Sequence, residues 1–187
     1  NNANGYASPS ALTEELLALR QVLAEQHDNL FAEGLDQFIT KVSLFGFHFS
    51  TLDIRQESRK HEAIIEEVIL KKAGQAAQDA YKAMSIHDKM VYLDSCTWGI
   101  DTSITTDPIS TDIIQSIAAI REIQASNGIK ACHRYVISNS RHALDVFSIQ
   151  ILARWIYGDS KLELDIVPLF ESIDDLGTAA DVMQELY

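Results

Sequence analysis

The sequence has few of the residues that mark several large classes of protein. Among its 187 residues are only 3 prolines, 8 glycines and 2 cysteines. A disordered or collagen-like chain would be far richer in proline and glycine, and 47% of apolar residues is enough for a buried core. We therefore expect a folded protein of ordinary domain size, with residues 1–187 forming a single segment without an internal domain boundary.

The two cysteines, Cys96 and Cys132, lack the Cys-x-x-Cys spacing of zinc and redox motifs. Both lie in ordinary apolar surroundings. Two buried free thiols in a reducing cytosol are the favoured interpretation, and a disulfide is the alternative. We expect a cytoplasmic protein.

Positive charge is also scarce, and long apolar runs are absent. The chain carries 15 Lys and Arg against 27 Asp and Glu, a net charge of −12, with no basic tract. This balance argues against nucleic acid or an anionic membrane surface as the main partner. No apolar run approaches the roughly 18 residues of a membrane span, and the polar first residues lack the features of a signal peptide.

Motifs for nucleotides and zinc are missing as well. The sequence contains no Gly-x-Gly-x-x-Gly motif, no P-loop and no His-x-x-x-His pair. His48 and His61 could carry protons, but neither has a serine or cysteine partner in a diagnostic motif. A hydrogen-bonded structural histidine is the favoured interpretation of each.

Apolar periodicity predicts a mostly helical chain with three short strands. The expected helices cover residues 9–26, 35–45, 58–74 (capped by Ser58), 108–127, 144–158 and 178–186, with a weaker helical stretch at 76–93. The expected strands cover residues 47–55, 135–138 and 164–170. A helix closely follows each strand, which implies parallel pairing with right-handed crossovers. The predicted fold class is α/β but mostly helical, either an α/β barrel or a doubly wound sheet with extra helices.

Polar residues follow each predicted strand, where parallel α/β folds gather their functional groups. Arg55, Asn139 and Glu171 are thus expected to meet at one rim of the sheet. Asp53 and Arg55 lie two residues apart on the predicted strand, so their side chains point to the same face. Arg55 could bind a phosphate or carboxylate, and Asp53 could hold the Arg55 side chain in place. A structural ion pair between these two residues is the favoured alternative. For Glu171, metal ligation and a place in the first turn of the next helix are equally good interpretations.

Three blocks of sequence resemble a known family. They are FGFHFSTLDIRQES at residues 45–58, YVIS at residues 135–138, and VPLFE with IDDL at residues 167–176. On these residues the chain closely resembles the phosphoenolpyruvate carboxylase family. The helix at 107–128 and the opening at 7–9 also look like the corresponding parts, and the fit is weakest between 72 and 106.

The resemblance implies the middle portion of a much longer chain, built as part of a phosphoenolpyruvate-binding TIM-type barrel with extra helices. It implies that Arg55 is one of several arginines that hold the phosphate and carboxylate of phosphoenolpyruvate. It also implies that Glu171 is one of two acidic ligands of an essential Mg²⁺ (or Mn²⁺) ion. Neighbouring polar residues are candidates for supporting roles: Asp53, Gln56, Glu57, Asn139 and Asp175.

In the implied reaction, phosphoenolpyruvate is carboxylated with bicarbonate to give oxaloacetate and phosphate. The oxaloacetate replenishes the tricarboxylic acid cycle. The complete enzyme is expected to be a homo-oligomer. The sequence lacks the family's motifs for a histidine, a glycine-arginine-rich loop and the second metal ligand, so we expect the chain alone to be inactive. A stand-alone acidic helical module that binds a partner is the alternative. Asn139 and Ser140 also stand where the family usually has methionine and alanine.

Overall fold

The computed structural model describes residues 5–158 and 163–187. Contacts between backbone positions divide the chain into two compact units. Unit 1 comprises residues up to Thr51 together with Ile123–Ala131, and unit 2 comprises Leu52–Glu122 together with Cys132–Tyr187.

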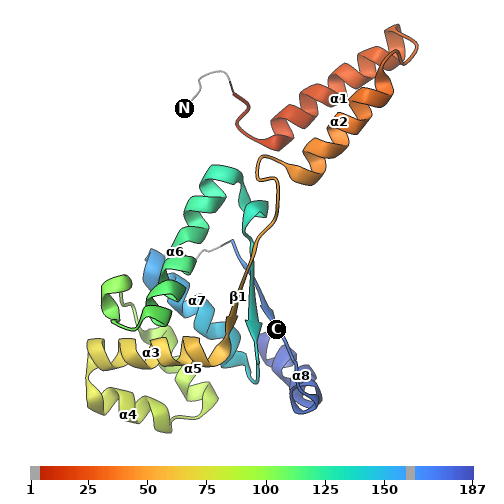
Figure 1. The fold of residues 1–187 in the computed structure, drawn as a ribbon. Helices are drawn as coiled ribbons and strands as arrows, with labels where there is room; N and C mark the ends of the chain where they lie inside the picture. Colours follow the sequence, from red (N-terminus) through yellow and green to blue (C-terminus); the bar gives the residue numbers. More distant parts are fainter. Residues whose placement is uncertain (1–4, 159–162) are drawn as a thin grey trace. The chain divides into compact units, whose positions relative to one another are not determined.

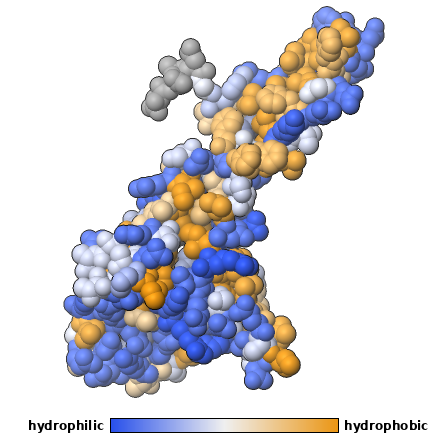
Figure 2. All heavy atoms as spheres, in the orientation of Figure 1, coloured by the Kyte–Doolittle hydropathy of each residue, from blue (hydrophilic) through white to orange (hydrophobic). Residues whose placement is uncertain are grey.

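Unit 1 contains a hairpin of two helices, α1 (Pro9–Gln26) and α2 (Ala32–Phe45) (Figure 1). Ser8 caps α1 through its Oγ, which accepts a hydrogen bond from the Ala11 N–H at 3.2 Å. Most apolar side chains of the hairpin are exposed, and Figure 2 shows them along its surface. Among the described residues, none of α1 is fully buried. The hairpin therefore has little core of its own.

Unit 2 is built around a sheet of three strands, β1 (Asp53–Glu57), β2 (Arg134–Ser138) and β3 (Asp165–Pro168), in the order β1-β2-β3. Both strand pairs are parallel, with Val136 of β2 directly opposite Arg55 of β1. The predicted parallel α/β arrangement in a mostly helical chain is confirmed. Within the described residues β1 and β3 each pair on one side only, so both have an open edge.

Each strand of unit 2 leads into a helix. These helices are α3 (Ser58–Ala73) after β1, α7 (Ala143–Tyr157) after β2 and α8 (Ile173–Leu186) after β3. Between β1 and β2 the chain also forms α4 (Gln75–Ala83), α5 (Ile86–Ser95), the 3₁₀ helix η1 (Thr102–Ile104), α6 (Pro108–Asn127) and the 3₁₀ helix η2 (Ile129–Ala131). No helix in the described part of the chain is long and apolar enough to cross a membrane.

The core of unit 2 lies between these helices and one face of the sheet. Helices α3, α5 and α7 pack together and bury large side chains such as Ile65, Leu93 and Trp155. The Trp155 indole N–H donates to the carbonyl of Cys96 at 3.1 Å. Cys96 and Cys132 are both buried thiols that are not joined in a disulfide, as predicted.

The two faces of the sheet differ in polarity. Tyr135 and Ile137 of β2 are fully buried, and Tyr135 faces α3 because its hydroxyl lies 2.8 Å from Nε2 of His61. Side chains alternate along a strand, so Arg55 and Arg134 belong to the opposite face, where both are exposed. Charged residues of the sheet therefore lie on the face away from α3.

The first strand lies later in the chain than predicted. It covers Asp53–Glu57 and not residues 47–55. Phe49 has a left-handed backbone with a φ of +62°, which breaks an extended run despite the β-prone aromatic residues around it. Ser58 also differs from the prediction, because it is the first residue of α3 and its Oγ donates to the carbonyl of Asn139 at 2.8 Å instead of capping the helix.

Three later elements differ in their boundaries. The third strand is shorter than predicted, since only Asp165–Pro168 belong to the sheet. The weak helical stretch predicted at 76–93 is two helices, α4 and α5. Helix α8 begins before residue 178, because Ser172 and Asp175 form a capping box that the spacing of apolar residues does not reveal.

A buried histidine and a buried tyrosine join α3 to the sheet. Both His61 and Tyr135 are fully buried, and their side chains are hydrogen-bonded. Burial lowers the pKa of His61 to about 4, with a smaller effect of the Lys60 charge, and burial raises the pKa of Tyr135. Both side chains are neutral at pH 7. The prediction of a hydrogen-bonded structural histidine is confirmed for His61.

We expect unit 2 to lose stability as the pH falls from about 6.5 towards 4. The folded state holds His61 neutral, whereas the unfolded chain protonates it near its ordinary pKa of 6.5, so the unfolded state binds more protons in this range. The loss should approach about 3 kcal/mol, measured by urea unfolding across the range. His61→Gln should remove this part of the slope, and an unchanged slope would contradict the assignment.

Candidate active site at the carboxyl ends of the strands

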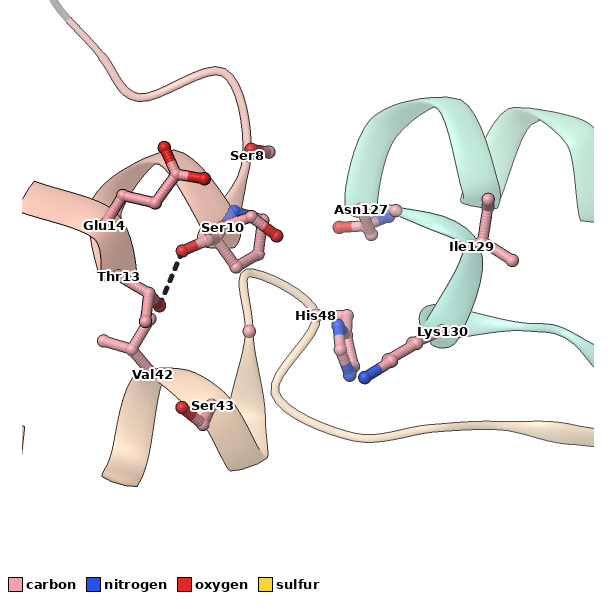
Figure 3. Close-up of a pocket in the computed structure, with 13 residues that line it drawn as sticks. Ser8, Ser10, Thr13, Glu14, Val42, Ser43, His48, Asn127, Ile129 and Lys130 are labelled. Atoms are coloured by element: carbon pink, nitrogen blue, oxygen red, sulfur yellow. Dashed lines mark hydrogen bonds between the residues drawn. The ribbon is translucent and has the colours of Figure 1, made fainter. Parts of the chain in front are cut away.

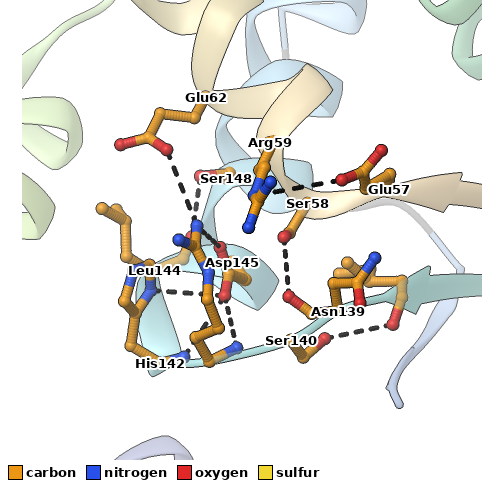
Figure 4. Close-up of polar contacts among 12 residues, drawn as sticks. Glu57, Ser58, Arg59, Glu62, Asn139, Ser140, His142, Leu144, Asp145 and Ser148 are labelled. Carbon is orange, nitrogen blue, oxygen red and sulfur yellow. Dashed lines mark hydrogen bonds and ion pairs between the residues drawn. The ribbon is translucent and has the colours of Figure 1, made fainter. Parts of the chain in front are cut away.

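Two of the three residues predicted to meet at the rim are joined by a hydrogen bond. The backbone N–H of Asn139, just after β2, donates to Oε2 of Glu171, just after β3, at 3.2 Å. The carbonyl of Asn139 accepts a hydrogen bond from Ser58 Oγ, at the start of α3, at 2.8 Å (Figure 4). Asn139 therefore links the carboxyl ends of all three strands.

Arg55 lies in the middle of β1, on the charged face of the sheet. Its side chain is exposed, and no hydrogen bond or ion pair within the described residues engages its guanidinium group. A guanidinium offers a rigid fork of donors that matches a phosphate or a carboxylate. Arg55 is therefore available to bind an anion on this face.

Asp53 pairs with a different arginine from the one expected. Its Oδ1 lies 3.5 Å from Nε of Arg134, the residue directly opposite in the strand register. The predicted ion pair between Asp53 and Arg55 is therefore wrong, because Asp53 pairs with Arg134 instead. Sequence analysis missed Arg134, although it lies two residues before Val136 and so shares the face of Arg55.

Gln56 and Glu57, predicted to support the site, make local contacts. Oε1 of Gln56 accepts a hydrogen bond from the N–H of Glu57 at 3.2 Å, and Oε1 of Glu57 lies 4.0 Å from Nε of Arg59 (Figure 4). Alternation along β1 assigns Gln56 to the face of Tyr135 and Glu57 to the face of Arg55. Of the two, only Glu57 shares a face with Arg55.

A second polar cluster fixes the loop after β2. Asp145, at the start of α7, is buried, and its Oδ2 accepts hydrogen bonds from the backbone N–H groups of Arg141 at 2.7 Å and His142 at 3.2 Å. Nη2 of Arg141 lies 3.7 Å from Oε2 of Glu62 on α3 (Figure 4). Sequence analysis did not single out Asp145 as a cap. Its contacts hold the loop between α3 and α7.

Glu171 offers one ligand of the kind that Mg²⁺ prefers. Its side chain is exposed, and a carboxylate that accepts one N–H has capacity for further partners. Proteins usually hold Mg²⁺ through one or two carboxylates together with water and substrate phosphates. The donor chemistry of Glu171 fits one position of such a site. Glu171 also precedes α8 and its cap, so it does not take the predicted alternative place in the first turn.

The described residues do not provide a complete metal cage. The carboxylate of Asp175 is engaged at the start of α8, where its Oδ2 accepts the N–H of Ser172 at 3.1 Å. Hydrogen bonds with Ser172, with a smaller effect of the Arg141 charge, lower the pKa of Asp175. Within residues 5–158 and 163–187, no group of three or more His, Cys, Asp or Glu side chains could hold a metal ion.

Unit 1 contains a separate cavity of about 610 Å³. Polar side chains in its lining include His48, Lys130, Ser10 and Glu14 (Figure 3). None of the predicted site residues lines it. The cavity is therefore distinct from the candidate site at the strand ends.

Comparison with known proteins identifies the family. A family model described as "Phosphoenolpyruvate carboxylase" matches residues 1–187. A phosphoenolpyruvate carboxylase of Prochlorococcus marinus subsp. pastoris is 30% identical over 97% of this chain and 19% of its own length. Another from a Synechocystis species is 30% identical over 98% of this chain and 18% of its own length. The chain thus spans about a fifth of the length of these relatives, and it belongs to the phosphoenolpyruvate carboxylase family.

Proposed function

We propose that this chain is the part of a phosphoenolpyruvate carboxylase that supplies one substrate-binding arginine and one metal-binding carboxylate. The complete enzyme carboxylates phosphoenolpyruvate with bicarbonate to give oxaloacetate and phosphate. The family match over residues 1–187 carries this proposal. The hydrogen bond between Glu171 and Asn139 also supports this proposal, because it lies at the carboxyl ends of the strands, where parallel α/β folds bind their ligands.

The sheet of unit 2 is proposed to continue into a TIM-type barrel. Its three strands are parallel, both of its outer edges are open, and each strand leads into a helix. In a barrel the helices lie outside and the other face of the sheet lines the interior. The face that carries Arg55 and the Asp53–Arg134 ion pair would then face inward. Residues 1–187 would form one continuous part of that barrel.

Arg55 is proposed to hold the phosphate or carboxylate of phosphoenolpyruvate. Its guanidinium is permanently charged and has no partner within the described residues, so it can make two hydrogen bonds to a planar carboxylate or to two phosphate oxygens. As the phosphoryl group passes to bicarbonate, a fixed cation can stabilise the charge that develops on its oxygens. Arg55 would thus both orient the substrate and lower the barrier.

Glu171 is proposed to be one ligand of Mg²⁺ (or Mn²⁺), and the second acidic ligand would come from outside the described residues. The metal supplies positive charge at the reacting oxygens when it is bound. Asn139 holds the carboxylate of Glu171 at the strand ends through its N–H. Asp53, Gln56, Glu57 and Asp175 remain candidates for supporting this site. A cytoplasmic homo-oligomer remains the expected form of the complete enzyme.

The substitution Arg55→Lys in the complete enzyme should reduce kcat/KM for phosphoenolpyruvate by about 100-fold. An ammonium group cannot make the two parallel hydrogen bonds that a guanidinium group makes to a carboxylate or phosphate. Steady-state kinetics at limiting phosphoenolpyruvate measures the change. Arg20→Lys is the matched control, since Arg20 forms an exposed ion pair with Asp36 in unit 1 and should leave the rate unchanged. An unaltered kcat/KM for Arg55→Lys would remove Arg55 from the substrate site.

The substitution Glu171→Gln should raise the Mg²⁺ concentration needed for half-maximal activity by about 100-fold. Loss of a partner that only orients a ligand already weakens metal binding by about 10-fold to 100-fold, and here a direct ligand is lost. A Mg²⁺ titration of activity gives the shift. Asp174→Asn removes an exposed carboxylate of α8 and should leave the titration unchanged. Identical titrations for wild type and Glu171→Gln would contradict the metal role.

The 187-residue chain by itself should form no oxaloacetate from phosphoenolpyruvate and bicarbonate. Its described residues supply only one carboxylate placed to bind the metal ion and no complete cage. A coupled assay with malate dehydrogenase detects oxaloacetate through the oxidation of NADH. Sustained turnover by the purified chain would show that the missing motifs are not needed.

A further inference from the structure

The strongest unassigned feature of the strand ends is the backbone of Asn139. Its N–H points to Oε2 of Glu171 at 3.2 Å, and its carbonyl accepts the hydroxyl hydrogen of Ser58 at 2.8 Å. We infer that Asn139 is a positioning residue for Glu171. The left-handed backbone of Asn139 directs its N–H at the Glu171 carboxylate and so holds that carboxylate at the carboxyl ends of the strands. This inference rests on the proposed role of Glu171 as a metal ligand.

The left-handed conformation of Asn139 decides where its two peptide groups point. Its φ is +54°, whereas the strand residues before it are extended. The N–H and the carbonyl of a residue belong to different peptide planes, and the rotations φ and ψ about its Cα together set the angle between these planes. A return of Asn139 to extended backbone would change the angle between its N–H and its carbonyl, so Glu171 and Ser58 could not both stay bonded.

The loop around Asn139 cannot easily relax, because the next residue is anchored on two sides. Ser140 is fully buried, and its Oγ donates to the carbonyl of Ile137 at 3.1 Å. The N–H of Ser140 donates to the carbonyl of Leu169, just after β3, at 3.1 Å. A change at Asn139 should therefore move the Asn139 N–H away from Glu171 before it moves the rest of the loop.

Asparagine suits this position for a reason that a test can isolate. Asparagine and glycine adopt left-handed backbone far more readily than other residues, and β-branched residues resist it most. If the conformation of Asn139 matters, glycine should preserve the function of the site and valine should impair it. If the amide side chain matters instead, both substitutions should impair it equally.

The experiment measures Mn²⁺ binding to the full-length polypeptide that contains this chain, by the loss of the free Mn²⁺ signal in electron paramagnetic resonance. This readout needs no substrate and no turnover. Residues that only orient a metal ligand typically change affinity by 10-fold to 100-fold. We expect Asn139→Val to weaken Mn²⁺ binding by about tenfold, whereas Asn139→Gly should stay within about threefold of the wild type.

Asn29 offers a matched control for the strain that valine introduces. It is also an asparagine with left-handed backbone, at a φ of +60°, but it lies between α1 and α2 in unit 1. Asn29→Val should impose a similar backbone strain and leave Mn²⁺ binding unchanged. Weakened binding in this control would mean that strain anywhere in the chain reduces affinity, and the inference would be overturned.

The variant Glu171→Gln separates the failure of this inference from the failure of the proposed function. If Glu171→Gln weakens Mn²⁺ binding and Asn139→Val does not, the positioning role is overturned and the metal role stands. If Glu171→Gln leaves binding unchanged, the proposed metal role fails and the positioning role fails with it. Equal losses in Asn139→Val and Asn139→Gly would overturn the backbone mechanism.

A second variant keeps the test decisive if Asn139→Val does not fold. Asn139→Ala differs from Asn139→Gly only by a Cβ, so it resists the left-handed backbone more than glycine does and less than valine does. We expect its Mn²⁺ affinity to be lower than that of Asn139→Gly in a protein whose circular dichroism spectrum is unchanged. Equal affinities for the alanine and glycine variants would overturn the inference.

Discussion

Parallel pairing of β1, β2 and β3 brings residues from three distant parts of the chain together at the carboxyl ends of the strands. Ser58 follows β1, Asn139 follows β2 and Glu171 follows β3, so all three stand at the carboxyl ends of their strands. The two hydrogen bonds of the Asn139 backbone depend on this arrangement. If β3 were antiparallel, Glu171 would lie at the amino ends of β1 and β2, and the site could not form.

The division of the sheet into two unlike faces decides which side chains can meet a ligand. The face towards α3 is closed by apolar side chains and by the hydrogen-bonded pair of His61 and Tyr135, which is neutral at pH 7. The other face carries Arg55, exposed and unpartnered within the described residues, beside the ion pair of Asp53 with Arg134. Burial on one face thus leaves the charged side chains of the other face exposed.

The sequence predicts the α/β class, the parallel pairing and the meeting of Asn139 with Glu171, because strand–helix alternation determines which ends of the strands lie together. It does not predict that Arg134 pairs with Asp53, since strand register depends on contacts between distant segments. It does not predict the late start of β1 either, because nothing in an aromatic-rich run indicates the left-handed backbone of Phe49. The proposed roles of Arg55 and Glu171 rest on the family resemblance, because spacing alone leaves both open.

The central claim is that Arg55 and Glu171 act at one site. The most direct measurement is a double-mutant cycle in the complete enzyme, which compares kcat/KM for Arg55→Lys, Glu171→Gln and the double variant at one fixed Mg²⁺ concentration. Residues that act on the same bound substrate and metal are strongly coupled, so the double variant should lose much less than the product of the two single losses. Losses that simply multiply would show that the two residues act independently, and would contradict a shared site.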